Sequence, residues 1–75
     1  MNLYECEKNK LCKIISVNID DNKIKLRLYE VGFFEDGEVK VLNRTFARKT
    51  MLVSVLDSCF VIKSDVAKNI EVKYG

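Results

Sequence analysis

Histidine is absent from the 75 residues of this sequence, and its absence restricts the chemistry of the chain. Imidazole is the side chain most often used as a general acid or base, and it is a common ligand of transition metals. A glycine-rich phosphate loop and a recognisable nucleophile–base pair are also missing. Asp20 and Asp21 are neighbours whose side chains diverge on a strand or a helix, so we predict capping rather than catalysis. The protein is therefore predicted not to be an enzyme, with no cofactor and no metal site.

Long apolar runs and proline are missing as well. The longest uncharged runs, residues 51–56 and 58–62, fall far short of the roughly 20 apolar residues of a membrane span. The first five residues have neither the basic start nor the apolar stretch of a secretory signal. We therefore expect a cytoplasmic protein with no direct membrane insertion.

Neither sign of charge dominates, since 13 Lys and Arg residues stand against 11 Asp and Glu residues. A chain of this length is expected to form one domain over residues 1–75, and its 48% apolar content is ordinary for a globular protein. The mixed charges do not form the basic stripe of a nucleic-acid binder, so no nucleic-acid partner is expected. One basic group, Arg44, Arg48 and Lys49, is interpreted as a solvated turn. A small barrel that binds nucleic acid through these three residues stays open as an alternative.

Cysteine is scarce, and its count is odd: Cys6, Cys12 and Cys59. An odd count argues against a disulfide framework. Cys6 and Cys12 are six residues apart, a spacing that does not fit a zinc knuckle. We predict buried, reduced thiols that pack as small apolar groups. A stand-alone module that senses a transition metal, with Cys6, Cys12 or a carboxylate cluster as ligands, is a further alternative.

The apolar pattern predicts five short strands, over residues 11–19, 38–43, 51–56, 59–62 and 70–74. In the first of them, Ile15, Val17 and Ile19 are expected to share one face of the strand. Residues 44–50 are expected to connect two strands. Residues 64–69 are predicted to be one helical turn, with Ser64 as its N-cap.

A helix is predicted over residues 22–31. Ile24, Leu28 and Val31 form one apolar stripe at helical spacing, and Gly32 stands where a C-terminal glycine is expected. Short strands in a small domain must curl to cover their apolar face and their edges. We therefore predict a mainly β fold, a small SH3-like, partly open barrel of about five strands. Its short helix lies between the first two strands and plugs one side, and a helical turn precedes the last strand.

Residues 27–41 resemble the signature of the FeoA family, which reads loosely as R-L-x-x-L-G followed by a second glycine five residues later. The positions of the motif that we assign to structure are Leu28, Gly32, Phe33 and Gly37. The similarity extends from about residue 3 to residue 72. Asp36 replaces the usual proline, and Val31 replaces the usual leucine. The loop at residues 43–50 also lacks the family's Gly-Asp-Pro-like turn.

The resemblance implies a small cytosolic accessory protein of bacterial ferrous iron uptake. The implied partner is FeoB, a membrane transporter with a cytosolic G-protein domain. The same module also occurs at the C-terminus of iron-dependent repressors, attached to a DNA-binding domain that is not present in this sequence.

The motif also suggests a docking surface. Both glycines are expected to need positive φ, while Leu28, Val31 and Phe33 are expected in the core. Phe34 is then left partly exposed beside Tyr29, because adjacent extended residues point in opposite directions. Exposed aromatic side chains are typical anchors of protein interfaces. The predicted partner-binding residues are Arg27, Tyr29, Phe34 and Glu35, and a contact between copies of the chain is the rival explanation.

Overall fold

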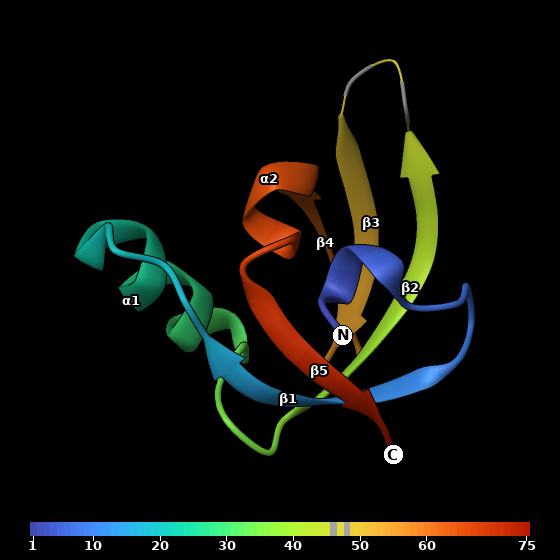
Figure 1. Cartoon of the computed structure of the whole chain (residues 1–75), viewed down its shortest axis with the longest axis horizontal. Coiled ribbons are helices and arrows are strands. Elements are labelled where there is room, and N and C mark those ends of the chain that lie inside the picture. The colour runs from blue at the N-terminus through green and yellow to red at the C-terminus, as the bar shows by residue number, and fades with distance from the viewer. Residues whose placement is uncertain (46, 48) are drawn as a thin grey trace.

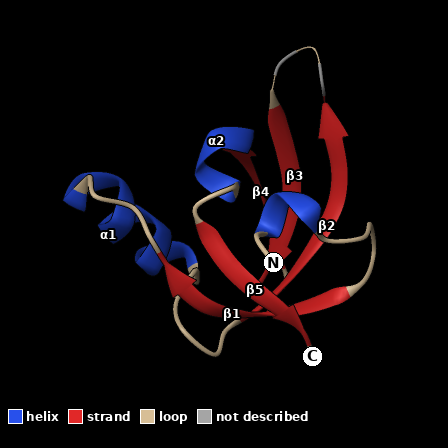
Figure 2. Cartoon of the chain, viewed as in Figure 1, coloured by secondary structure: helices blue, strands red, loops and turns tan. Residues whose placement is uncertain are grey.

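A computed structural model of the chain describes residues 1–45, 47 and 49–75. Strands predominate, as Figure 2 shows in red. In chain order the elements are the 3-10 helix η1 (Leu3–Glu5), β1 (Leu11–Val17), α1 (Asn22–Val31), β2 (Glu38–Thr45), β3 (Thr50–Val55), β4 (Ser58–Lys63), α2 (Ser64–Ala67) and β5 (Ile70–Tyr74). The predicted mainly β fold is confirmed, with a short helix between the first two strands and a helical turn before the last.

The five strands form one open antiparallel sheet in the order β4-β3-β2-β1-β5. The sheet curls around the core, as Figure 1 shows, and β4 and β5 are its two outer strands. The first residues of the chain lie along the free edge of β5. There the amide of Val72 donates to the carbonyl of Met1 at 2.8 Å, and Asn2 bridges to Glu71. This edge is therefore partly covered by the chain itself.

The core consists of the alternating apolar residues of the sheet, together with Leu3, Cys6, Leu28, Phe33 and Ala67. Met51, Val53 and Val55 of β3 are all buried, as their alternation predicts. Each large apolar side chain that is fully buried contributes about 1.5–3 kcal/mol. The buried strand residues are Cys12, Ile14, Val17, Val39, Val41, Met51, Val53, Val55, Ile70 and Val72.

The face assignment of the first strand was wrong. Ile15 is 47% exposed, while Ile14 and Val17 are buried. The pairing of β1 with β5 shifts its register between Ile14 and Ser16, and such a bulge adds one residue and reverses the alternation. The strand ends at Val17, so Ile19 lies beyond it.

Two predicted boundaries also differ. The connection predicted over residues 44–50 is shorter, because β2 continues to Thr45 and β3 begins at Thr50. Ser64 is the first residue of α2 rather than its N-cap, which is Lys63. β4 leads directly into α2, so the extended last residue of the strand occupies the capping position. The buried Ser64 donates its amide to the carbonyl of Lys49 at 2.8 Å.

Both predicted ends of α1 are confirmed. The Asp21 side chain accepts from the amides of Lys23 at 2.9 Å and Ile24 at 3.4 Å, and Gly32 ends the helix with a φ of 116°. The predicted apolar stripe is buried only in part. Leu28 is buried and Val31 is half-buried, but Ile24 is 38% exposed. Figure 1 shows α1 projecting to one side of the sheet, which leaves its first turn outside the core.

Candidate docking surface

An apolar groove runs between α1 and β4, and Val66 of α2 also lines it. Its volume is about 450 Å³, within the size range of ligand and peptide pockets. Buried Phe33 and Leu28 form its base, and exposed Val61 stands at its edge. We call it the α1–β4 groove, and its lining residues are Ile24, Arg27, Leu28, Val31, Phe33, Phe60, Val61, Ile62, Lys63 and Val66.

The charged residues of the groove are of one sign. Arg27 comes from α1 and Lys63 from the end of β4, and both are exposed. Two cations beside an apolar surface favour a partner that offers apolar side chains flanked by carboxylates. The lining of the groove is therefore complementary in chemistry to a protein surface of that composition.

The structure places two of the predicted partner-binding residues on different sides of α1. Arg27 lines the groove, whereas Tyr29 lines a small hollow with Asn22, Lys25 and Leu26. Helical residues two positions apart point about 200° away from each other, which explains the separation. The Lys25 ammonium lies 5.9 Å from the centre of the Tyr29 ring. Arg27 and Tyr29 therefore do not belong to one narrow patch.

The other two predicted residues lie in the turn that follows α1. Phe34 is 43% exposed while Phe33 is fully buried, as expected for adjacent residues that point in opposite directions. Glu35 is exposed next to Phe34. The turn is closed by the amide of Gly37, which donates to the carbonyl of Phe34 at 3.0 Å. Phe34 is thus presented to solvent by a hydrogen-bonded turn.

The prediction of positive φ is confirmed for Gly32 and wrong for Gly37. In the turn it is Asp36 that has a positive φ, of 65°. Gly37 is needed for space, because a Cβ at this position would lie 2.9 Å from the carbonyl oxygen of Phe34. The turn is also fixed to β1 by two hydrogen bonds. The amide of Asp36 donates to the carbonyl of Ile14 at 2.8 Å, and the amide of Ile14 donates to the carbonyl of Gly37 at 2.9 Å.

Among the described residues, the two most exposed large apolar side chains were not identified from the sequence. Val61 is 68% exposed in β4, and Leu56 is 66% exposed in the turn between β3 and β4. The available signal was the unbroken apolar run 59–62 in β4, which does not alternate as a half-buried strand should. An outer strand with apolar residues on both faces leaves one of them in water.

The structure brings together the two described residues of the basic group that was predicted as a solvated turn. Arg44 and Lys49 line one hollow with Tyr4 and Lys68, and Arg48 lies outside the described residues. Arg44 is half-buried, and its Nε donates to the carbonyl of Tyr4 at 3.0 Å. Its Nη2 donates to the same carbonyl at 2.6 Å and to that of Cys6. Two of the three guanidinium nitrogens of Arg44 are therefore engaged with backbone carbonyls, which weakens the nucleic-acid alternative.

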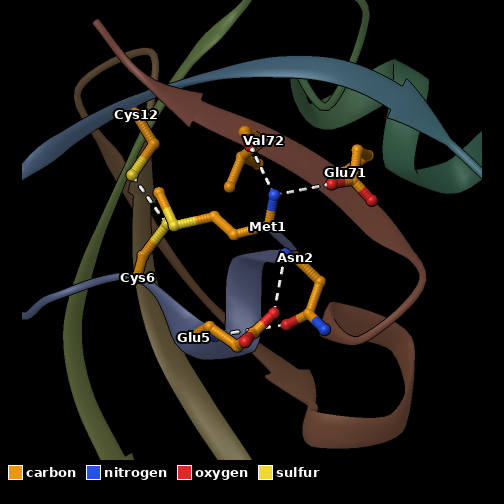
Figure 3. Close-up of polar contacts among 7 residues, drawn as sticks. All are labelled: Met1, Asn2, Glu5, Cys6, Cys12, Glu71 and Val72. Atoms are coloured by element: carbon orange, nitrogen blue, oxygen red, sulfur yellow. Dashed lines mark hydrogen bonds and ion pairs between the residues drawn. The ribbon is translucent and has the colours of Figure 1, made fainter.

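The prediction of buried, reduced thiols is confirmed for Cys6 and Cys12, but Cys59 is exposed on the outer strand β4. Figure 3 shows the first two sulfur atoms facing each other at 2.7 Å. Burial, together with the hydrogen bond to Cys12, raises the pKa of the Cys6 thiol to about 12. Within residues 1–45, 47 and 49–75, Cys, Asp and Glu side chains do not gather in a group of three or more that could hold a metal ion.

No helix in the described part of the chain is both long enough and apolar enough to cross a membrane.

Known structures share the fold. FeoA from Chlorobium tepidum superposes with a TM-score of 0.89 at 20% identity, over 99% of this chain and 70% of that one. A zinc complex of FeoA from Stenotrophomonas maltophilia, described as an SH3 domain protein, gives a TM-score of 0.82 at 26% identity, over 97% of this chain and 89% of that one. A manganese-dependent transcriptional repressor gives 0.88 at 17% identity, with the whole of this chain matching 36% of that protein.

The sequence itself matches the FeoA domain over residues 1–74. It is also 36% identical over 61 residues to a protein of Campylobacter jejuni named putative Fe(2+) transport protein A. That alignment covers 80% of this chain and 82% of the relative. The family resemblance noted at residues 27–41 is thereby confirmed, and the chain belongs to the FeoA family.

Proposed function

We propose that this chain is a non-catalytic accessory protein of bacterial ferrous iron uptake. In this proposal it acts in the cytoplasm as a single FeoA-like domain, and its partner is the cytosolic part of a FeoB-type membrane transporter. The family match over residues 1–74 and the name of the Campylobacter jejuni relative support the connection with ferrous iron transport. The exposed apolar groove beside α1 supports binding to a protein rather than catalysis.

The α1–β4 groove is the observation that carries this proposal. Val61, at the edge of the groove, is 68% exposed. Phe34, in the turn that follows α1, is 43% exposed. Burying one such side chain at an interface contributes about 1.5–3 kcal/mol. Arg27 and Lys63 attract carboxylates of the partner across the opening of the groove. The transporter domain would therefore present an apolar segment with acidic residues beside it.

The remaining predicted contacts lie around this centre. Phe34 and Glu35 extend the surface from the groove to the turn after α1. Tyr29, on the other side of the helix, contacts a partner that wraps around α1 rather than one confined to the groove. Arg27, Tyr29, Phe34 and Glu35 are thus proposed as partner-binding residues of unequal weight, with Tyr29 the most peripheral.

Calorimetric titration of the purified chain into the transporter's cytosolic domain tests the proposal. Val61→Asp places a carboxylate in the groove, and we expect it to weaken binding at least about tenfold. Leu11→Asp is the matched control, because Leu11 is 41% exposed and does not line the groove. Absence of binding by the unaltered chain would contradict the proposed function. If Val61→Asp instead dissociated a homo-oligomer, the groove would be a contact between copies.

A further inference from the structure

The fold brings Cys6 and Cys12 into direct contact. Their sulfur atoms lie 2.7 Å apart, and the two residues are 1% and 0% exposed. A disulfide bond is about 2.05 Å long, so the sulfurs need to approach by only a further ~0.7 Å. We propose that Cys6 and Cys12 form a reversible disulfide in the folded protein, which makes them a redox-sensitive modification site. This inference is independent of the proposed function.

Both cysteines are positioned by backbone contacts on either side of the pair. Arg44 of β2 donates to the carbonyls of Tyr4 and Cys6, which holds the end of η1 against the sheet. Cys12 lies in β1, between its partners Val39 on β2 and Tyr74 on β5. Because both backbones are fixed, the two thiols stay in contact without a covalent bond.

Hydrogen bonds involve both thiols. The Cys12 thiol donates to the carbonyl of Lys10 at a sulfur–oxygen distance of 3.6 Å. Between the two sulfurs, either thiol can act as the donor. Both thiols lose their protons when the S–S bond forms.

The oxidant in this proposal is a low-molecular-weight disulfide of the glutathione type. The thiolate of one cysteine attacks a sulfur of the oxidant, which forms a mixed disulfide and releases one glutathione thiolate. The other cysteine, once deprotonated, attacks the protein sulfur of that mixed disulfide and releases the second glutathione thiolate. The two protons pass to the two released thiolates. Two electrons leave the cysteines, so two protein thiols and one glutathione disulfide become one protein disulfide and two molecules of glutathione.

Access to the pair comes through the N-terminal segment. Residues 7–10, which connect the two cysteines, are exposed, and η1 is only three residues long. Local opening of such short segments costs less free energy than global unfolding. The exchange is therefore slow, but its equilibrium is determined by how well the closed structure holds the sulfurs together.

The test uses the full chain with Cys59→Ser, which removes the exposed thiol and leaves the pair intact. The protein is equilibrated in glutathione redox buffers from both the reduced and the oxidised side. The disulfide is then quantified by acid quenching, alkylation and mass spectrometry. The same measurement is repeated in concentrated guanidinium chloride. The quantity compared is the ratio of glutathione disulfide to the square of the glutathione concentration at which half of the chain is oxidised. We expect this ratio to be at least about tenfold lower for the folded chain than for the unfolded chain. A tenfold difference corresponds to about 1.4 kcal/mol in the free energy of disulfide formation.

The same preference must appear in stability, because oxidation and folding are linked. A tenfold preference, about 1.4 kcal/mol, raises the melting temperature of the oxidised chain by about 6–11 °C. Cys12→Ala in the Cys59→Ser background is the control, and it must show neither the intramolecular disulfide nor the rise in melting temperature. A folded-state preference below about tenfold, a melting temperature that falls on oxidation, or covalent dimers as the main product would each overturn the proposal.

Discussion

The guanidinium of Arg44 on β2 holds the carbonyl of Tyr4, forty positions earlier in the chain, with two donors at 3.0 and 2.6 Å. The same guanidinium also donates to the carbonyl of Cys6. Tyr4 lies in η1, next to Leu3, which is fully buried. A single side chain therefore attaches the N-terminal segment to the middle of the sheet.

Replacing Arg44 with Met is expected to destabilise the fold. The substitution keeps most of the apolar stem but removes three hydrogen bonds from a charged donor, and two carbonyls lose their partner. Hydrogen bonds to charged groups contribute about 1.5–3 kcal/mol each, and we expect a total loss of about 2–4 kcal/mol because water replaces some of them. Urea unfolding measures the loss. Lys40→Met, on the same strand, is the control, and an equal effect there would contradict this role of Arg44.

Arg44 illustrates which parts of the fold the sequence predicts and which it does not. Local signals identified the strands and α1 correctly, because alternation, Asp21 and Gly32 act within a few neighbouring residues. The carbonyls that Arg44 binds belong to a segment far away in the sequence, so local pattern cannot reveal them. For the same reason the sequence identified α1 as one border of the candidate site but not Val61, whose exposure depends on β4 being an outer strand.

Because of the bulge in β1, alanine substitutions at the adjacent residues Ile14 and Ile15 should differ strongly in their effect on stability. Ile14 is buried and Ile15 is 47% exposed, although alternation alone placed Ile15 on the same face as the buried Val17. Ile14→Ala should cost about 2–5 kcal/mol of unfolding free energy, the range for large buried residues cut to alanine. Ile15→Ala should stay within about 0.5 kcal/mol of the unaltered chain, as surface substitutions do. Chemical denaturation compares the two, and equal losses would mean that the register shift is absent.

The Cys6 thiol makes stability depend on pH in the alkaline range. Burial, with the hydrogen bond to Cys12, raises its pKa in the folded chain from 9.0 to about 12. Below pH 9 the thiol is protonated in both states, so its contribution to stability is fully present. Between pH 9 and about 12 the unfolded chain loses this proton and the folded chain keeps it, so stability falls as pH rises.

Urea unfolding midpoints at pH 7 and pH 10.5 measure this effect, with the Cys59→Ser chain as the reference. The matched variant is Cys6→Ala in the same background, since both chains share every other titrating group. We expect the midpoint to fall more in the reference chain than in the Cys6→Ala chain. Equal falls would show that Cys6 titrates normally in the folded state.

In the turn after α1, a glycine can be required either by lack of space or by a positive φ, and these two requirements fall on different residues, Gly37 and Asp36. Gly37→Ala should destabilise the chain by about 1–3 kcal/mol, the usual cost of overpacking, because the added Cβ would lie 2.9 Å from the carbonyl oxygen of Phe34. Asp36→Gly should be tolerated, because Asp36 has the positive φ of 65° that glycine adopts readily. Thermal denaturation of both variants distinguishes the two. Loss of stability in Asp36→Gly alone would mean that the Asp36 side chain, rather than the space at Gly37, supports the turn.

Phe34 offers the sharpest separation of binding from folding. Its ring is 43% exposed at a turn that is already closed by the hydrogen bond between Gly37 and the Phe34 carbonyl. Phe34→Ser keeps this backbone bond, so the melting temperature should change by no more than about 4 °C. If the ring docks against the transporter's cytosolic domain, affinity should fall by about tenfold or more. Leu11→Ser, which removes a side chain of 41% exposure outside the groove, should leave affinity unchanged. Unchanged affinity with a falling melting temperature in Phe34→Ser would assign Phe34 to the core and remove the turn from the docking surface.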